Sequence, residues 1–161
     1  KSMALIHETL YRAKDLASLD IESYLNQVIR FLTKIYQSPG SRVRIEMAVD
    51  DINLDLDKSI TCGLIINELV SNALKYAFQD GVKEGIIWIS YKKESDQRVR
   101  LTVSDNGKGI DQSIDMENLD SLGLKIVQML AEDQLDGLFS MEQQDERLTF
   151  NIEFPIMEEE E

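Results

Sequence analysis

Apolar side chains recur every three to four residues in three parts of the chain, which predicts helices with one buried face. These are the segment between Asp20 and Ser38, the segment that follows Asp55 or Asp57 and contains Asn67–Tyr76, and Leu122–Glu132. Aspartates are good helix caps, and the Ser-Pro-Gly sequence at Ser38 stops the first helix. Residues 1–17 have similar spacing without a capping box, which predicts the end of a longer helix.

Alternation of apolar and polar residues predicts five strands with one buried face each. They cover residues 43–49, 85–93, 99–105, 137–143 and 147–156. Residues 106–121 are rich in acidic residues and show little periodicity, which predicts a long loop; long loops inside compact domains are usually functional or disordered. Helices combined with mostly antiparallel strands predict an α+β fold. We expect a two-layer α/β sandwich whose mixed, mostly antiparallel sheet has helices packed on one face.

Composition and charge narrow the range of partners. A chain of 161 residues fits one domain with a real core. The formal net charge of -13 opposes binding to nucleic acids and to anionic membranes. Cys62 is the only cysteine, so an intrachain disulfide is impossible, and a reducing, cytoplasmic compartment is expected. No apolar run is long enough to cross a bilayer.

The helix that contains Asn67–Tyr76 has an unusual polar face. At 100° per residue, Glu68, Asn72 and Lys75 fall within one narrow arc, with Ser71 and Asn67 to one side. The opposite arc is apolar. Asparagine and serine cost a few tenths of a kcal/mol, roughly up to 0.7, in a helix interior relative to alanine. This face is either a solvated surface or one wall of a binding site.

A second motif, Asp105-Asn-Gly-Lys-Gly-Ile110, follows a strand in which Val99, Leu101 and Val103 share one side with Asp105. A carboxylate that points toward the core needs donors, either from local backbone or from a ligand such as an adenine amino group. Asn-Gly also favours a tight hairpin, but no alternating strand follows directly, which favours a loop that leaves the sheet. Gly107 and Gly109 would then let a ligand approach the backbone, and Gly123 begins a helix whose free N–H groups suit phosphate.

The order of these motifs resembles the ATP-binding domain of sensor histidine kinases, within the gyrase, chaperone, histidine kinase and MutL ATPase superfamily. The likeness rests on Asn-Glu-x-x-x-Asn-Ala-x-Lys-Tyr at 67–76, Asp-x-Gly-x-Gly at 105–109 and Ser-Leu-Gly-Leu at 121–124. It implies ATP and Mg²⁺ as cofactors and transfer of the γ-phosphoryl group to a histidine. The N-terminal segment further resembles the subgroup with a His-x-x-Lys-Asn type dimerisation domain.

The resemblance also implies roles for individual residues. Glu68 would be the general base or water-orienting group, and Asn72 would bind Mg²⁺. Lys75 and Tyr76 would touch phosphates or sugar, and Asp105 would read the adenine amino group. The other residues expected to line the nucleotide pocket are Gly107, Gly109, Ile110, Ser121, Leu122, Gly123 and Leu124. Residues 108–122 would form its lid.

At the domain level, the resemblance implies a remnant of a dimerisation helix and linker at 1–19, an ATP-binding catalytic domain at 20–156 and an acidic tail at 157–161. Expected partners are the dimerisation domain that carries the acceptor histidine, and a response regulator receiver domain; the parent would be a homodimer. His7 is a poor acceptor because Tyr11 stands where Asn or Thr is expected. We therefore expect the acceptor histidine to be absent.

Two other functions share such a pocket. The chain could be a non-catalytic module in which ATP only orders the lid. It could also be an anti-sigma serine kinase, which the dimerisation-like N-terminus disfavours. DNA-repair and topoisomerase ATPases fit poorly because the chain is acidic and short.

Overall fold

The computed structural model describes residues 21–36, 42–52, 54–78, 84–107 and 122–156. Its elements, in chain order, are α2 (Ile21–Tyr36), β1 (Val43–Val49), α3 (Leu56–Asn72), the π-helical turn η1 (Ala73–Ala77), β2 (Gly85–Lys93), β3 (Arg98–Asp105), α4 (Leu122–Met129), the π-helical turn η2 (Leu130–Gln134), β4 (Leu138–Gln144) and β5 (Arg147–Pro155). The predicted helix and linker at 1–19 and the tail at 157–161 lie outside the described residues.

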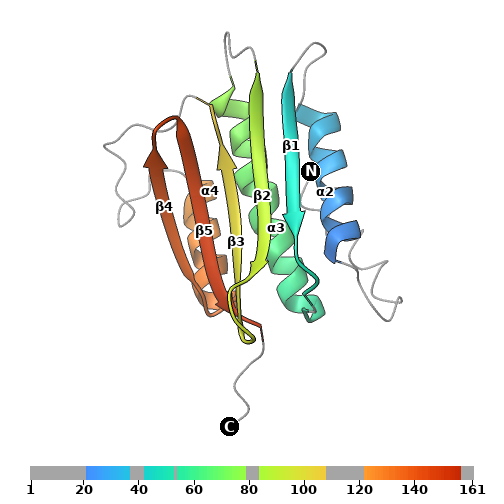
Figure 1. The fold of residues 1–161 in the computed structure, drawn as a ribbon, viewed down its shortest axis with the longest axis vertical. Coiled ribbons are helices and arrows are strands. Elements are labelled where there is room, and N and C mark those ends of the chain that lie inside the picture. Colours follow the sequence, from blue (N-terminus) through green and yellow to red (C-terminus); the bar gives the residue numbers. More distant parts are fainter. Residues whose placement is uncertain (1–20, 37–41, 53, 79–83, 108–121, 157–161) are drawn as a thin grey trace.

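The five strands form one mixed sheet in the order β1-β2-β3-β5-β4. β1 and β2 run parallel, and α3 belongs to the segment that connects them. The other neighbouring pairs are antiparallel. α2, α3 and α4 all lie on the same face of the sheet (Figure 1). The predicted α+β sandwich is confirmed.

The core lies between this sheet face and the helices. Alternation along β3 turns Val99, Leu101, Val103 and Asp105 toward the helices, and all four are buried. The side chains that face the other way, such as Thr102 and Ser104, belong to the face opposite the described helices, where they bond to residues of β5. The sequence pattern therefore places Asp105 on the helix side of the sheet, at the end of an apolar row.

Aspartate capping and helix packing fix the position of α3. Asp55 is its N-cap, and the Asp55 Oδ1 accepts a hydrogen bond of 2.8 Å from the Lys58 N–H. α2 packs against α3, where Tyr24 lies over Gly63. A Cβ at position 63 would overlap the Tyr24 hydroxyl oxygen and lie 2.6 Å from the ring Cζ. The absence of a side chain at Gly63 therefore sets how close the two helices approach.

One local expectation needs correction. The helices predicted to include Tyr76 and Glu132 both leave α-helical geometry before they end, in the π-helical turns η1 and η2. The Asn106-Gly107 hairpin, which the sequence disfavours, is excluded because β3 already has β2 and β5 as its two neighbours.

Candidate functional site

The polar face of α3 is accessible only in part. Glu68 and Asn72 are half-buried, Lys75 is exposed, and Tyr76 is 58% exposed. Asn67 and Ser71, in contrast, are buried. The accessible polar surface is therefore narrower than the sequence predicts.

The last turn of this helix carries two of the predicted site residues. Lys75 and Tyr76 belong to the π-helical turn η1, whereas Glu68 and Asn72 belong to α3. A π-helical turn has a wider hydrogen-bonded ring than an α-helix, and such turns occur frequently at functional sites. The sequence gives no direct signal for it, because helical periodicity alone does not distinguish the two geometries.

Asp105 ends β3 on the helix side of the sheet and is only 5% exposed. Its Oδ1 accepts a hydrogen bond of 3.0 Å from the Gly107 N–H. Burial raises the pKa of this carboxyl above its ordinary value, and the Gly107 N–H opposes that rise. The sequence allows two sources of hydrogen-bond donors for Asp105, the local backbone and a ligand. The structure shows the backbone donor, and this hydrogen bond is compatible with a ligand as a second donor.

Gly107 brings the strand motif against the end of the polar helix. A Cβ at position 107 would lie 2.5 Å from the Ala77 Cβ and closer still to the Ala77 carbonyl oxygen. No side chain fits there, so the backbone after Asp105 approaches η1 directly. Asn106, between Asp105 and Gly107, extends the pairing of β3 with β2, since its Oδ1 accepts a 2.7 Å hydrogen bond from the Ile86 N–H. The motif that begins at Asp105 and the end of the polar helix, which are distant in sequence, therefore meet at one place.

The third motif lies at the start of α4, which packs against α3. Leu122 is 74% exposed, Gly123 is partly exposed, and Leu124 belongs to the hydrophobic core. The structure therefore gives Leu124 a packing role, and its place in the pocket stays a prediction. Gly109, Ile110, Ser121 and the rest of the predicted lid to residue 121 lie outside the described residues.

The donors and acceptors at this place suit a magnesium nucleotide. Asn72 offers an amide oxygen, and Mg²⁺ commonly takes few protein ligands and completes its shell with water and phosphate. Lys75 offers an ammonium to phosphate, and the buried Asp105 carboxylate offers acceptors to an amino group. Glu68 offers a carboxylate on the same helix surface as Asn72. The chemistry of these four side chains is that needed for a cation, a polyanion and an amino group.

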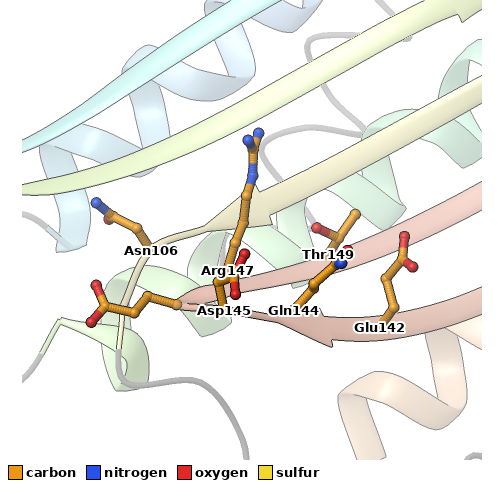
Figure 2. Close-up of a pocket in the computed structure, with 7 residues that line it drawn as sticks. Asn106, Glu142, Gln144, Asp145, Arg147 and Thr149 are labelled. Carbon is orange, nitrogen blue, oxygen red and sulfur yellow. The ribbon is translucent and has the colours of Figure 1, made fainter.

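A separate hollow of about 360 Å³ lies on the face of the sheet opposite the described helices. Its lining residues are Asn106, Glu142, Gln144, Asp145, Glu146, Arg147 and Thr149 (Figure 2). The Arg147 guanidinium stacks 3.9 Å from the centroid of the Trp88 ring. None of the residues predicted to bind nucleotide lines this hollow. Asp105 and Asn106 are thus neighbours in sequence, but Asn106 lines this hollow whereas Asp105 faces the helices.

One residue near the site escapes sequence reasoning. The Lys75 Nζ lies 4.8 Å from the centroid of the Tyr36 ring, at the end of α2. The two residues belong to different helices, and no spacing rule connects them. The aromatic character of Tyr36 is a weak signal, because the same helix also carries the buried Tyr24.

Comparison with known proteins identifies the family of the chain. A family model described as histidine kinase-, DNA gyrase B- and HSP90-like ATPase matches residues 57–158, and a second, described as histidine kinase, matches residues 1–36. The sensor histidine kinase PdtaS of Mycobacterium tuberculosis is 31% identical over 92% of this chain. The blue-light-activated histidine kinase 2 of Erythrobacter litoralis is 25% identical over 78% of it. The chain spans 29% and 38% of these two proteins.

Solved structures show the same fold. The histidine kinase domain of the Erythrobacter litoralis blue-light-activated kinase EL346 superposes with a TM-score of 0.84 and 23% identity, covering 96% of this chain and 73% of that one. The mycobacterial sensor histidine kinase MprB superposes with a TM-score of 0.66 and 16% identity, covering 85% of this chain and 96% of that one. Among the described residues, no helix combines the length and the apolar character needed to span a membrane. The chain belongs to the histidine kinase-, DNA gyrase B- and HSP90-like ATPase family.

Proposed function

We propose that this chain is the ATP-binding catalytic domain of a two-component sensor histidine kinase, and that it positions the γ-phosphoryl group of Mg-ATP for transfer to a histidine of a dimerisation domain. The family match supports ATP binding, and the names of the sequence relatives support the kinase class. A response regulator receiver domain would be the next acceptor. Cytoplasmic location and a homodimeric parent are part of the same proposal.

The proposed roles follow from the chemistry of each side chain. When bound, Mg-ATP supplies the phosphoryl group and the cation that offsets its charge. Asn72 would hold the cation, and Lys75, with Tyr76 beside it, would orient the phosphates or sugar. Glu68 would accept a proton or orient a nucleophile. Catalysis of phosphoryl transfer is mainly positioning and charge stabilisation, which these groups can provide.

At the other end of the nucleotide, Asp105 would select adenine. Its carboxylate would accept a hydrogen bond from the amino group. Gly107, Gly109, Ile110, Ser121, Leu122, Gly123 and Leu124 are proposed to line the pocket. The observation that carries the proposal is the contact of Gly107 with Ala77, because it sets the buried carboxylate beside the end of the helix that bears Glu68, Asn72 and Lys75.

The proposal is tested by titration with an ATP analogue, with and without Mg²⁺, on the wild type and on Asp105→Asn. A hydrogen bond to a charged group contributes about 1.5–3 kcal/mol, so we expect affinity to fall by about 10- to 150-fold. Asp145→Asn is the matched control, because Asp145 lines the hollow on the opposite face of the sheet. Equal affinity in all three proteins would contradict the role of Asp105.

Catalysis is tested separately from binding. We expect Glu68→Gln to keep nucleotide affinity but to lose transfer of radiolabelled phosphate to a supplied dimerisation domain. Unchanged transfer would remove Glu68 from the mechanism. Binding without transfer in the wild type would instead favour a regulatory module that uses ATP only to change conformation.

A further inference from the structure

The chain leaves the sheet at Asn106, the residue that follows β3. The register that pairs Asp105 with Ile87, continued by one residue, sets Asn106 opposite Ile86. The Asn106 N–H donates a 3.2 Å hydrogen bond to the Ile86 carbonyl oxygen, as in a regular antiparallel pair. In such a pair the Asn106 backbone carbonyl would accept the return bond, but the Ile86 N–H donates to the Asn106 side-chain Oδ1 at 2.7 Å. The side-chain amide thus takes the place of the main chain at this step of the ladder.

This substitution lets the main chain turn away directly after Asp105. The Gly107 N–H points back to the Asp105 Oδ1, 3.0 Å away. A carboxylate that accepts from the N–H two residues further along forms an Asx turn. The same turn carries Gly107 against Ala77, at the end of the polar helix. The Asn106 side chain therefore closes the sheet at the point where the chain must cross to the proposed site.

The turn also orients the Asp105 carboxylate. This side chain is 5% exposed, and one of its oxygens is held by the Gly107 N–H. Direction matters for the recognition of a base, because a hydrogen bond weakens steeply when donor and acceptor are out of line. We propose that Asn106 is a positioning residue, which acts through Gly107 to hold the Asp105 carboxylate toward the amino group of adenine; the inference rests on the proposed function of the site.

The test removes the acceptor at position 106 and keeps the size of the side chain. Asn106→Leu has no acceptor, whereas Asn106→Asp keeps an oxygen for the Ile86 N–H. Two non-hydrolysable triphosphates are titrated with Mg²⁺ by calorimetry: an ATP analogue, and the same compound without the amino group on its purine ring. Their affinity ratio isolates recognition of the amino group, because a change of charge at position 106 affects both triphosphates alike.

A hydrogen bond to a charged group corresponds to about a 10- to 150-fold change in affinity. We expect the wild type to prefer the ATP analogue by a factor in this range. Asn106→Leu should lose most of this preference, and Asn106→Asp should retain it. An unchanged affinity ratio in Asn106→Leu, or an equal loss of the ratio in Asn106→Asp, would overturn the inference.

Thr102→Val is the matched control. It removes the 3.0 Å hydrogen bond from the Thr102 Oγ1 to the Asn151 Oδ1, between β3 and β5. We expect it to lower the stability in urea and to leave the affinity ratio of the folded protein unchanged. A ratio lost equally in Thr102→Val would mean that any weakening of β3 disturbs Asp105, and would overturn the specific role of Asn106.

A measurement on the wild type covers the case in which Asn106→Leu does not fold. The Ile86 N–H should exchange slowly with solvent, because the Asn106 side chain accepts its hydrogen bond. An Ile86 N–H that exchanges as fast as in an unfolded peptide would overturn the proposal.

The outcomes also separate this inference from the proposed function. If the wild type binds neither triphosphate, the proposed function fails and the role of Asn106 fails with it. If the wild type prefers the ATP analogue and Asp105→Asn does not, but Asn106→Leu keeps the preference, only the role of Asn106 is overturned.

Discussion

The α3–η1 helix makes two close contacts in which a glycine lets another element approach, and the two serve different ends. At Gly63, within α3, the Tyr24 ring of α2 lies directly on the helix in the buried core. At Ala77, in η1, the backbone of Gly107 lies against the helix beside the proposed site. The first contact joins two helices, and the second sets the spacing between two motifs of the proposed site. Similar packing constraints can therefore have different consequences for stability and for binding.

Gly107→Ala should have the largest effect. The new Cβ would meet the backbone and Cβ of Ala77, which cannot rotate away, so β3 and η1 must separate. Overpacking of this kind costs about 3 kcal/mol. We expect both a lower free energy of unfolding in urea and a loss of nucleotide affinity.

Gly137→Ala is the matched control for that change. Its Cβ would lie 2.5 Å from the Glu153 carbonyl oxygen, between η2 and β4. It should lower the stability while the affinity of the folded protein is retained. An equal loss of affinity in both variants would mean that the Gly107 contact has no special connection with the site.

Gly63→Ala should cost about 2 kcal/mol of stability, because its Cβ would overlap the end of the buried Tyr24 side chain. Urea denaturation measures the loss. Nucleotide affinity, measured well below the denaturation midpoint, should be unchanged. A selective loss of affinity would show that the helix–helix contact also shapes the site, and would weaken the contrast drawn above.

Nucleotide affinity should also depend on pH through Asp105. Burial raises the pKa of this carboxyl, so protonation begins at a higher pH than for an ordinary aspartate. Affinity should fall as pH falls through this raised pKa, by at most about tenfold per pH unit, equivalent to about 1.4 kcal/mol. Titrations over a pH series should show this slope in the wild type and not in Asp105→Asn.

Asp105 should also make the stability of the protein depend on pH, in the opposite direction to the affinity. Because the pKa of Asp105 is raised in the folded state, its contribution to the free energy of unfolding is fully present below the unfolded pKa and is lost as pH rises through the folded pKa. Urea denaturation of the wild type and Asp105→Asn across this window measures the difference. Parallel slopes for stability and affinity would contradict the assignment of either effect to Asp105.

Tyr24→Phe should give the smallest effect, a gain of about 1 kcal/mol. The Tyr24 hydroxyl is buried and has no hydrogen-bond partner among the residues that the structure describes, and an unpaired buried polar group is unfavourable. Thermal and urea unfolding measure the gain. Introduced into Gly63→Ala, the same change should recover part of the lost stability, because it removes the atom that the new Cβ overlaps.

The sheet could be predicted well because its signal is local. Alternation along 85–93 and 99–105 reappears as the buried rows of β2 and β3, and it correctly turns Asp105 toward the helices. Fold class followed from the mixture of helical and alternating segments. Strand order could not be predicted with the same certainty, because pairing between β3 and β5 depends on contacts between segments distant in sequence.

The candidate site was only partly predictable for a related reason. A helical wheel groups Glu68, Asn72 and Lys75 within one arc, but it cannot show that Asn67 and Ser71 are buried. Nor can it detect the π-helical turn or the ring of Tyr36 near Lys75. These features arise where one element packs on another, and the sequence of a single element does not contain them.

The π-helical turn at the end of α3 has a consequence for protein engineering. Each residue of such a turn advances around the axis by less than it does in an α-helix, so Lys75 and Tyr76 are out of phase with the preceding turns. Deleting one residue within Ala73–Ala77 would convert the turn to ordinary α-helix. Every later side chain of the helix would then point in a different direction around the helix axis. The directions in which Lys75 and Tyr76 project are therefore set by the number of residues in one turn, in addition to their identities.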